Sequence, residues 1–265
     1  PWDLVVKAVE AVCTTPWVLL YVKRWLAAPL RYPDGTLVER DKGTPQGSAV
    51  SPILANLFMH FAFDSWIVRN YPGIQFERYA DDAVVHCVSR RQAEVVLAGI
   101  AERMQEVGLR LHPDKTRIVH CKDGKRRGDH EHTSFTFLGF TFRARKARDK
   151  KGRYFTSFLP AMSTEALKAK GAQLRAMRIH RRPDLTLDDL ARWLNPIVAG
   201  WMQYYGRFYR SAMYPLLERV SAYLRRWAGR KYRRLRTFKR FKRWWAGLLD
   251  RAPGLFAHWR WVHSY

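Results

Sequence analysis

Apolar residues recur at three- and four-residue steps in several parts of the chain, which is the spacing of one face of an α-helix. This spacing predicts helices over residues 4–12, 16–26, 51–62 and 91–107. Thr15 is expected to cap the second helix, with Pro16 at its first position. The third helix is apolar on nearly every side, so we expect it to be buried. Gly108 is expected to end the fourth helix.

Shorter runs alternate between apolar and polar residues, as strands do. They predict strands over residues 74–78, 83–88, 109–111, 116–120, 135–142 and 154–159, with a basic turn over 143–153. Pro33, Asp34 and Gly35 form a turn signal between two short alternating segments, which predicts one more hairpin.

From Ser163 onwards only the helical pattern continues. It predicts long helices over residues 163–180, 186–206 and 213–245. The fold class that follows is α+β, with a helical unit after a mixed one. We expect a first domain over residues 1–160, a second over 161–250 and a short basic tail over 251–265.

Asp81 and Asp82 stand side by side at the bend between two predicted strands. Adjacent carboxylates repel each other, and a bound divalent cation relieves that repulsion. Oxygen ligands of this kind suit Mg²⁺, which polymerases use in pairs to activate an attacking hydroxyl and to stabilise the leaving oxygen. A surface turn with two solvated aspartates explains the same pair, so the motif alone leaves both possibilities open.

The charge of the chain indicates a polyanionic partner. Lys and Arg number 48 against 23 Asp and Glu, a formal net charge of +25, which is more than solubility requires. The excess is concentrated after residue 160, where there are 23 basic and 6 acidic residues. We expect the densest basic stretch to contact phosphates. It contains Arg225, Arg226, Arg230, Lys231, Arg233, Arg234, Arg236, Lys239, Arg240, Lys242 and Arg243.

No run of eighteen apolar residues is present, so the sequence predicts no membrane-spanning helix. Cys13, Cys87 and Cys121 are scattered and lack the spacing of a zinc site. They fit a reducing compartment, and we expect a cytoplasmic protein.

Five segments resemble, in the same order, motifs of group II intron reverse transcriptases. Tyr79-Ala80-Asp81-Asp82 resembles the active-site box of these enzymes. Three further segments resemble neighbouring motifs of the family. They are Gly43-Thr44-Pro45-Gln46-Gly47 with Ser51-Pro52, Gly108-Leu109 through His112-Pro113-Asp114-Lys115-Thr116, and Phe137-Leu138-Gly139-Phe140. The fifth segment resembles the maturase domain of this family. It consists of Leu194-Asn195-Pro196 through Gly200-Trp201, followed by Tyr204-Tyr205-Gly206-Arg207-Phe208.

The resemblance implies a partial right-hand polymerase palm, an antiparallel sheet with helices, followed by an all-α thumb. It implies that Asp81 and Asp82 are catalytic and hold magnesium in a two-metal site. The implied nucleotide-binding residues are Tyr79, Ala80, Pro45, Gln46, Gly47 and Lys115. The implied primer grip is Phe137, Leu138 and Gly139, and Arg207 joins the basic stretch in binding nucleic acid.

Several of these residues also have a purely structural explanation. The Pro-Gln-Gly segment fits a rigid turn before a helix, and Lys115 fits a solvated lysine at the end of a strand. Phe137 and Phe140 fit a core position, because strand alternation alone places them there. The aromatic residues around Tyr204 follow helical spacing and fit core packing as well as stacking on RNA.

One part of the family pattern is not found. A polymerase palm takes a third metal-binding carboxylate from an earlier strand, but Asp3 stands at the wrong place in that motif and Asp64 lies in a predicted helix. The fingers blocks are not found either. We therefore expect a fragment with an incomplete metal site and little polymerisation by itself. A missing segment or a partner polypeptide would supply the fingers.

The leading function is that of an RNA-directed DNA polymerase that also acts as the maturase of its own intron. The expected partners are group II intron RNA, a duplex of RNA template and DNA primer, and deoxynucleoside triphosphates, and the expected cofactor is Mg²⁺. The alternative is a non-enzymatic splicing factor that binds intron RNA. The intact aspartate pair favours the enzyme, whereas the missing third ligand favours the RNA-binding protein.

Overall fold

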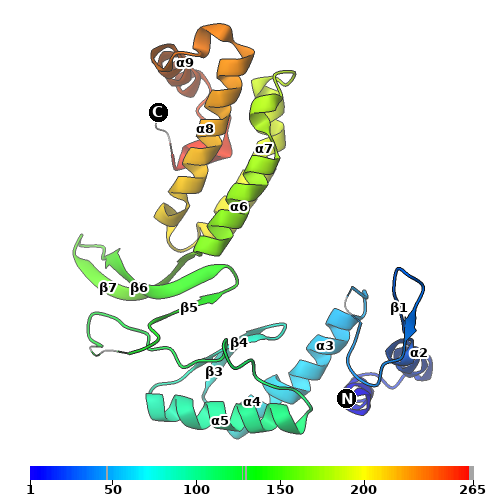
Figure 1. The fold of residues 1–265 in the computed structure, drawn as a ribbon. Helices are drawn as coiled ribbons and strands as arrows, with labels where there is room; N and C mark the ends of the chain where they lie inside the picture. The colour runs from blue at the N-terminus through cyan, green and yellow to red at the C-terminus, as the bar shows by residue number, and fades with distance from the viewer. Residues whose placement is uncertain (46, 127, 129, 263–265) are drawn as a thin grey trace. The chain divides into compact units, whose positions relative to one another are not determined.

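The computed structural model describes residues 1–45, 47–126, 128 and 130–262, and in this part the chain is a mixture of helices and small antiparallel sheets (Figure 1). The chain divides into two compact units. The N-terminal unit is Pro1–Ile118 and the C-terminal unit is Val119–Tyr265, and each is described by itself. Within the described residues, no helix combines the length and the apolar character needed to cross a membrane.

The N-terminal unit is built mainly from helices. They are α1 (Trp2–Glu10), α2 (Pro16–Ala27), α3 (Ser51–Met59), the π-helical turn η1 (His60–Asp64), α4 (Ser65–Asn70) and α5 (Arg90–Glu106). One core joins α1, α2 and α3 through Val5, Val22 and Leu54. A second core joins η1, α4 and α5 through Ile67 and Val96. The helices predicted over 4–12, 16–26 and 91–107 are confirmed.

The prediction for the third helix is wrong in its extent and its burial. The apolar helix predicted over 51–62 continues as η1 and α4, and much of α3 is exposed, with Ile53 67% exposed. Its apolar residues lie all round the helix, but within the N-terminal unit the buried position of α3 is Leu54. Thr15 is the N-cap residue of α2 and Pro16 is its first residue, as predicted, although the Thr15 side chain makes no capping hydrogen bond.

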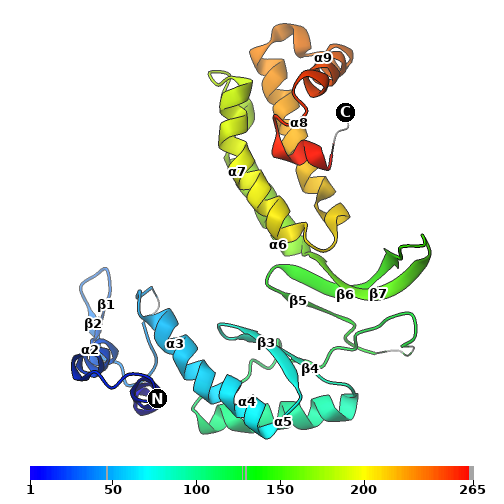
Figure 2. The same cartoon turned by 180° about the vertical axis from the view of Figure 1, so that it is seen from behind.

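The N-terminal unit also contains two hairpins. The short pair β1 (Leu30–Arg31) and β2 (Leu37–Val38) confirms the hairpin predicted around Gly35. The longer pair, β3 (Gln75–Tyr79) and β4 (Asp82–His86), packs its inner residues Phe76 and Val85 against the core of α4 and α5 (Figure 2). The strands predicted over 109–111 and 116–120 are wrong, because those residues pair with no neighbouring strand in the described chain.

The C-terminal unit begins with a three-stranded antiparallel sheet in the order β5 (Ser134–Phe137), β6 (Phe140–Arg148) and β7 (Tyr154–Met162). The single strand predicted over 135–142 is wrong. Leu138 and Gly139 have φ angles of 50° and 76° and form a two-residue turn that folds the segment into a hairpin. The basic segment predicted as a turn over 143–153 extends β6 as far as Arg148, and only its second half turns.

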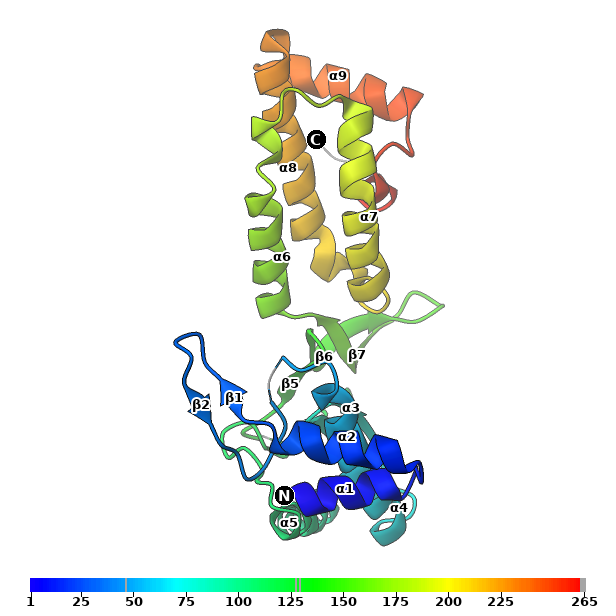
Figure 3. The same cartoon turned by 90° about the vertical axis from the view of Figure 1, so that its right-hand side faces the viewer.

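Helices form the rest of this unit. They are α6 (Thr164–Ala176), α7 (Leu187–Tyr205), α8 (Tyr214–Lys231) and α9 (Phe238–Arg251), with short 3-10 turns η2 (Ile179–Arg181), η3 (Arg210–Met213), η4 (Arg233–Leu235) and η5 (Ala257–Arg260). Figure 3 shows α6, α7 and α8 side by side and α9 crossing them near one end. The helix predicted over 213–245 is wrong as one element, since η4 separates α8 from α9.

The core of the C-terminal unit is rich in large aromatic residues. Trp227, Phe241 and Trp259 are almost completely buried and belong to one cluster with residues of α6, α7 and α8. The last described segment takes part in it, because Phe256, Trp259 and Val262 are buried there. Residues 252–262 therefore fold back onto the helices.

Candidate active site and nucleic-acid interface

The adjacent aspartates lie at the tip of the β3–β4 hairpin. Tyr79 pairs with Asp82 across the two strands, so Ala80 and Asp81 form the two-residue turn between them. Ala80 has a φ of 55°, a left-handed conformation that costs a residue with a side chain about 1 kcal/mol. Asp81, Asp82 and Tyr79 are all exposed. The hairpin therefore presents both carboxyl groups on a short and sharply defined turn.

Arg78 fixes this turn to the helix beneath it. Its Nε and Nη2 atoms donate to the two carboxylate oxygens of Asp64, both at 2.7 Å, and Nη1 donates to the carbonyl oxygen of Ala80 at 2.8 Å. The same Nη1 atom lies 3.1 Å from Oδ1 of Asn56. The arginine side chain is 11% exposed, and the hydrogen bonds to Asp64 raise its pKa. A partly buried, two-pronged ion pair of this kind holds its partners in one geometry.

The carboxylates of Asp81 and Asp82 take part in no ion pair within the described residues, although the guanidinium of Arg78 is close in sequence. Asp64 occupies that guanidinium instead. The two aspartates thus keep free oxygen donors of the kind that Mg²⁺ prefers. The described part of the chain contains no group of three or more His, Cys, Asp or Glu residues arranged to hold a metal ion.

The other residues predicted for the nucleotide site come from two loops. Gln46 lies outside the described residues. Next to it, the Ser51 hydroxyl donates to the Pro45 carbonyl at 2.7 Å, and Gly47 has a φ of 87°. Lys115 lies exposed in a turn after α5. Neither loop forms a hydrogen bond or ion pair with the Ala80–Asp81 turn in the described chain, so their role in nucleotide binding stays a prediction.

The predicted primer grip is the turn between β5 and β6. The hydroxyl of Tyr204 on α7 donates to the Leu138 carbonyl at 2.9 Å, and the backbone N–H of Ser163 donates to the Gly139 carbonyl at 2.8 Å. A Cβ atom on Gly139 would lie 3.3 Å from the ring of Tyr205. The helix α7 therefore supports this turn directly, and its geometry requires glycine at the second position.

The aromatic residues around Tyr204 mainly pack together. The rings of Tyr204, Tyr205 and Phe208 surround Phe140 at centroid distances of 5.2, 5.5 and 5.6 Å. Phe140 is buried, whereas Phe208 is 57% exposed. The packing accounts for Tyr205 and Phe140, and the outer faces of Tyr204 and Phe208 remain accessible.

The predicted basic stretch covers the end of α8, η4 and the start of α9. Ten of its eleven basic side chains are exposed, and so is Arg207. Lys231 is different, because its ammonium group donates to the carbonyls of Pro183 and Leu185 at 2.8 and 2.7 Å. We call the ten exposed residues the basic face. They are Arg225, Arg226, Arg230, Arg233, Arg234, Arg236, Lys239, Arg240, Lys242 and Arg243.

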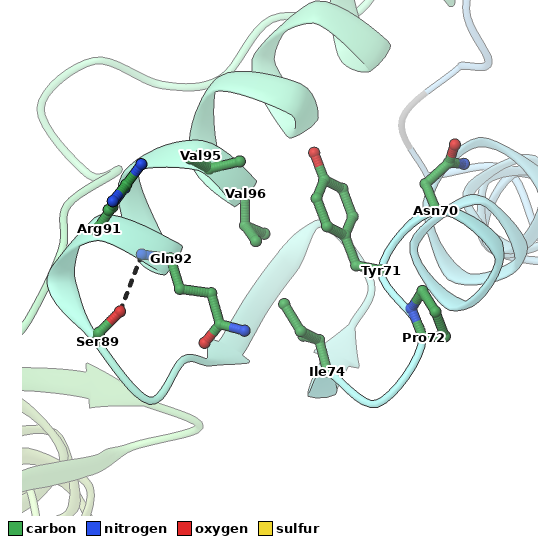
Figure 4. A pocket seen from close by; sticks show the side chains of 9 residues that line it. All are labelled: Asn70, Tyr71, Pro72, Ile74, Ser89, Arg91, Gln92, Val95 and Val96. Carbon is green, nitrogen blue, oxygen red and sulfur yellow. Dashed lines mark hydrogen bonds between the residues drawn. The ribbon is translucent and has the colours of Figure 1, made fainter.

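A hollow of about 460 Å³ lies at the open end of the β3–β4 hairpin, the end away from the aspartates (Figure 4). Tyr71 and Ile74 line one side, and Gln92 and Val96 of α5 line the other. The backbone N–H of Gln92 donates to the hydroxyl of Ser89 at 3.1 Å, which caps α5. The other polar side chains of the lining include Asn70 and Arg91, and none of the lining residues is acidic.

Two models of known protein families match segments of the chain. Residues 1–142, more than half of the chain, match the family model described as reverse transcriptase (RNA-dependent DNA polymerase). The chain belongs to the reverse transcriptase family. Residues 167–245 of this reverse transcriptase match a second model, described as the group II intron maturase-specific domain. No curated protein matches the chain.

The two matches together identify a group II intron reverse transcriptase and maturase. The matches support the function of an RNA-directed DNA polymerase and maturase of a group II intron, and they imply RNA and other nucleic acids together with deoxynucleoside triphosphates as substrates. The aspartate pair and the Leu138–Gly139 turn lie in the segment that matches the reverse transcriptase model. The whole basic face lies, with α8, in the segment that matches the maturase domain.

Sequence reasoning missed two side chains that hold turns of this reverse transcriptase in place, Arg78 at the Ala80–Asp81 turn and Tyr204 at the Leu138–Gly139 turn. Arg78 precedes the active-site box directly, but its partner Asp64 lies 14 residues earlier. Tyr204 contacts a turn 66 residues away. Only the first offered a signal, since an arginine beside an acidic turn suggests an ion pair. The structure shows that this ion pair forms with Asp64.

Proposed function

We propose that residues 1–160 form a polymerase palm, residues 161–250 a thumb and residues 251–265 a short basic extension. The order of the family matches, with the reverse transcriptase segment over 1–142 and the maturase segment over 167–245, supports this division. The compact units divide earlier in the sequence, between Ile118 and Val119. In the proposal, the sheet β5–β6–β7 is the last part of the palm before the helices begin.

Asp81 and Asp82 are proposed as the catalytic carboxylates. The observation that carries the assignment is a rigid hairpin turn that presents two carboxylates without an ion-pair partner in the described residues, in a chain of this family. The donors fit Mg²⁺, which when bound promotes phosphoryl transfer to a primer hydroxyl. The protein's own contribution is orientation. Arg78, which is held by Asp64, donates to the Ala80 carbonyl, and in the proposal this contact orients the turn that carries both aspartates.

The nucleotide pocket is proposed around the same turn, with Tyr79 and Ala80 on the hairpin, Pro45, Gln46 and Gly47 in the loop before α3, and Lys115 after α5. The methyl side chain of Ala80 leaves room next to the aspartates for a primer end. A lysine such as Lys115 suits a triphosphate because its ammonium group is a compact positive charge. Phe137, Leu138 and Gly139 are proposed to support the primer strand.

The basic face and Arg207 are proposed to hold RNA through its phosphates. Ten exposed cations within one short stretch repel one another, and a polyanion offsets that repulsion while releasing its own counterions. Binding to RNA should therefore weaken steeply as the salt concentration rises. Replacing Lys239, Arg240, Lys242 and Arg243 with Gln is expected to reduce the slope of log affinity against log salt by about 3, at roughly 0.7 per phosphate contact.

The experiment that tests the enzyme assignment compares the protein with Asp81→Asn/Asp82→Asn in two assays. One measures incorporation of deoxynucleotides into a DNA primer on an RNA template with Mg²⁺, and the other measures binding to a group II intron RNA. We expect the variant to lose incorporation and to keep RNA binding. Measurable incorporation by the wild type that the variant retains in full would contradict the assignment of these aspartates.

A second function, that of an intron RNA-binding splicing factor without synthesis, is favoured by the charge of the helical part. Residues 161–265 hold 23 basic and 6 acidic residues, and the basic face does not depend on the aspartates. A wild-type protein that binds intron RNA and promotes splicing but incorporates no nucleotide would support this second function over the first.

A further inference from the structure

A second group of cations lies on the sheet of the C-terminal unit, outside the basic face. Alternation along β6 places Thr141, Arg143 and Arg145 on one face of the strand. This face borders a hollow of about 560 Å³. The remaining polar lining comes from Thr164, Tyr209 and Ser211, so the hollow is bounded by β6, the start of α6 and the segment around η3.

The guanidinium of Arg145 is held in place on two sides. Its Nε atom donates to the Leu159 carbonyl and its Nη2 atom to the Thr141 carbonyl, both at 3.2 Å. Its Cζ atom lies 5.3 Å from the centre of the Tyr209 ring. An arginine carries five N–H donors, so these contacts orient the group and leave several donors free for a ligand.

The positive charge in this hollow has no counter-charge among the described residues. Neither Arg143 nor Arg145 forms an ion pair within the part of the chain that the structure describes, and no carboxylate there lines the hollow. Burial lowers the pKa of Arg145, and the positive charge of Arg143 lowers it further. Two guanidiniums that repel each other at a partly buried site are an unfavourable arrangement, which an anion would relieve.

The chemistry of the lining indicates the kind of anion. Arginine forks match the oxygens of a phosphate, and hydroxyl groups donate to the same oxygens. The volume falls within the range of ligand sites, about 300 to 1,000 Å³, although the hollow is polar. We propose that this hollow, the Arg143–Arg145 pocket, binds a phosphodiester group of a nucleic-acid strand. The proposal rests on the proposed function, because it adds a second phosphate contact to a protein that already binds RNA.

The test measures binding of a short labelled single strand by fluorescence anisotropy, as RNA and as DNA of the same sequence, between about 50 and 200 mM salt. The pocket variant is Arg143→Gln/Arg145→Gln. The control, Lys150→Gln/Lys151→Gln in the β6–β7 loop, removes the same charge outside the pocket. We expect the pocket variant to bind both strands roughly tenfold more weakly at low salt and to lower the salt slope by about 1.4, whereas the control changes affinity less than about twofold.

Because Arg145 also bonds to two carbonyls, thermal unfolding of the pocket variant is measured alongside. Arg143→Gln alone keeps the test valid if the double variant unfolds, since the Arg143 side chain is exposed and forms no hydrogen bond or ion pair in the described structure. It should show about half of the slope change, roughly 0.7.

Equal affinities of the pocket variant and the control would overturn the proposal. Binding of inorganic phosphate that the pocket variant loses, with unchanged affinity for both strands, would also overturn it, because the site would then take free phosphate. Failure of the proposed function looks different. In that case the wild-type protein itself fails to bind RNA, or Lys239→Gln/Arg240→Gln on the basic face leaves binding unchanged.

Discussion

His258 should make the stability of the C-terminal unit depend on pH. Its side chain is buried, with 1% of its surface exposed, and its Nε2 atom lies 2.9 Å from the hydroxyl of Ser221 on α8. Burial lowers the pKa of this histidine to about 3. The same residue in an unfolded chain has a pKa of about 6.5. The folded protein therefore keeps His258 neutral over a range in which the unfolded chain binds a proton.

The sign and size of the effect follow from this difference. The contribution of His258 is fully present above about pH 6.5, and it is lost as the pH falls from there towards 3. Each unit of pH in this window removes about 1.4 kcal/mol, so at pH 5 the free energy of unfolding should be about 2 kcal/mol lower than at pH 7.5. In a unit of this size, that difference corresponds to roughly 4–8 °C in melting temperature.

The assay is urea or thermal unfolding between pH 5 and 8, followed by circular dichroism, for the wild type and for His258→Gln. Glutamine can still bond to Ser221 but does not titrate. The variant should be less stable at neutral pH and should lose much less stability on acidification. His120 and His180, whose pKa values burial also lowers, are present in both proteins and cancel in the comparison. An identical pH dependence of the two proteins would refute the reasoning.

Other predictions concern packing and the two supported turns. Gly206→Ala should lower the free energy of unfolding by about 1–3 kcal/mol, because the new Cβ atom would overlap the ring of Trp261, and thermal unfolding measures this. Arg78→Lys keeps the charge but loses the two-pronged pair with Asp64. We expect this variant to lose nucleotide incorporation while its melting temperature changes little. Asn56 is another side-chain partner of Arg78. If Asn56→Ala lost as much incorporation as Arg78→Lys, the Arg78–Asp64 pair would not be the contact that orients the turn. Tyr204→Phe should cost about 1 kcal/mol through the lost hydrogen bond to the primer-grip turn, and an unchanged melting temperature would contradict that contact.

Local patterns in the sequence predicted much of the fold. The helices α1, α2 and α5 follow from apolar spacing, and Gly108, with a φ of 75°, ends the last of them as expected. The β5–β6 turn also left a signal that alternation alone concealed. The phenylalanines change from odd to even positions across Leu138 and Gly139, which is the shift that a two-residue turn produces.

Long-range contacts were beyond such reasoning. The pairing of Arg78 with Asp64 joins a strand to a helix, and nothing in the spacing of the two residues specifies it. The break between α8 and α9 depends on packing, because Leu235 of η4 is buried in the core while the charged residues around it stay exposed. For α3 the sequence predicted burial that the structure does not show. Its apolar composition favoured burial on nearly every side, but much of its surface is exposed within the N-terminal unit.

The site residues divide in the same way. The sequence predicted Asp81 and Asp82 as a cation site because neighbouring carboxylates at a bend repel each other. The structure confirms that they stand at a hairpin bend, and their role as metal ligands stays a prediction. Lys231 could not be separated from its neighbours by charge. The structure shows its ammonium group bound to two backbone carbonyls, which only the folded chain brings within reach.

The most direct measurement of the central claim is binding of Mn²⁺, a spectroscopic substitute for Mg²⁺, followed by electron paramagnetic resonance. The wild type is compared with Asp81→Asn/Asp82→Asn and with Glu102→Gln/Asp114→Asn, which removes the same charge from exposed positions of the N-terminal unit. We predict saturable binding by the wild type and by the control, and loss of that binding in the aspartate variant. Equal Mn²⁺ binding by all three proteins would show that the hairpin carboxylates do not hold the metal.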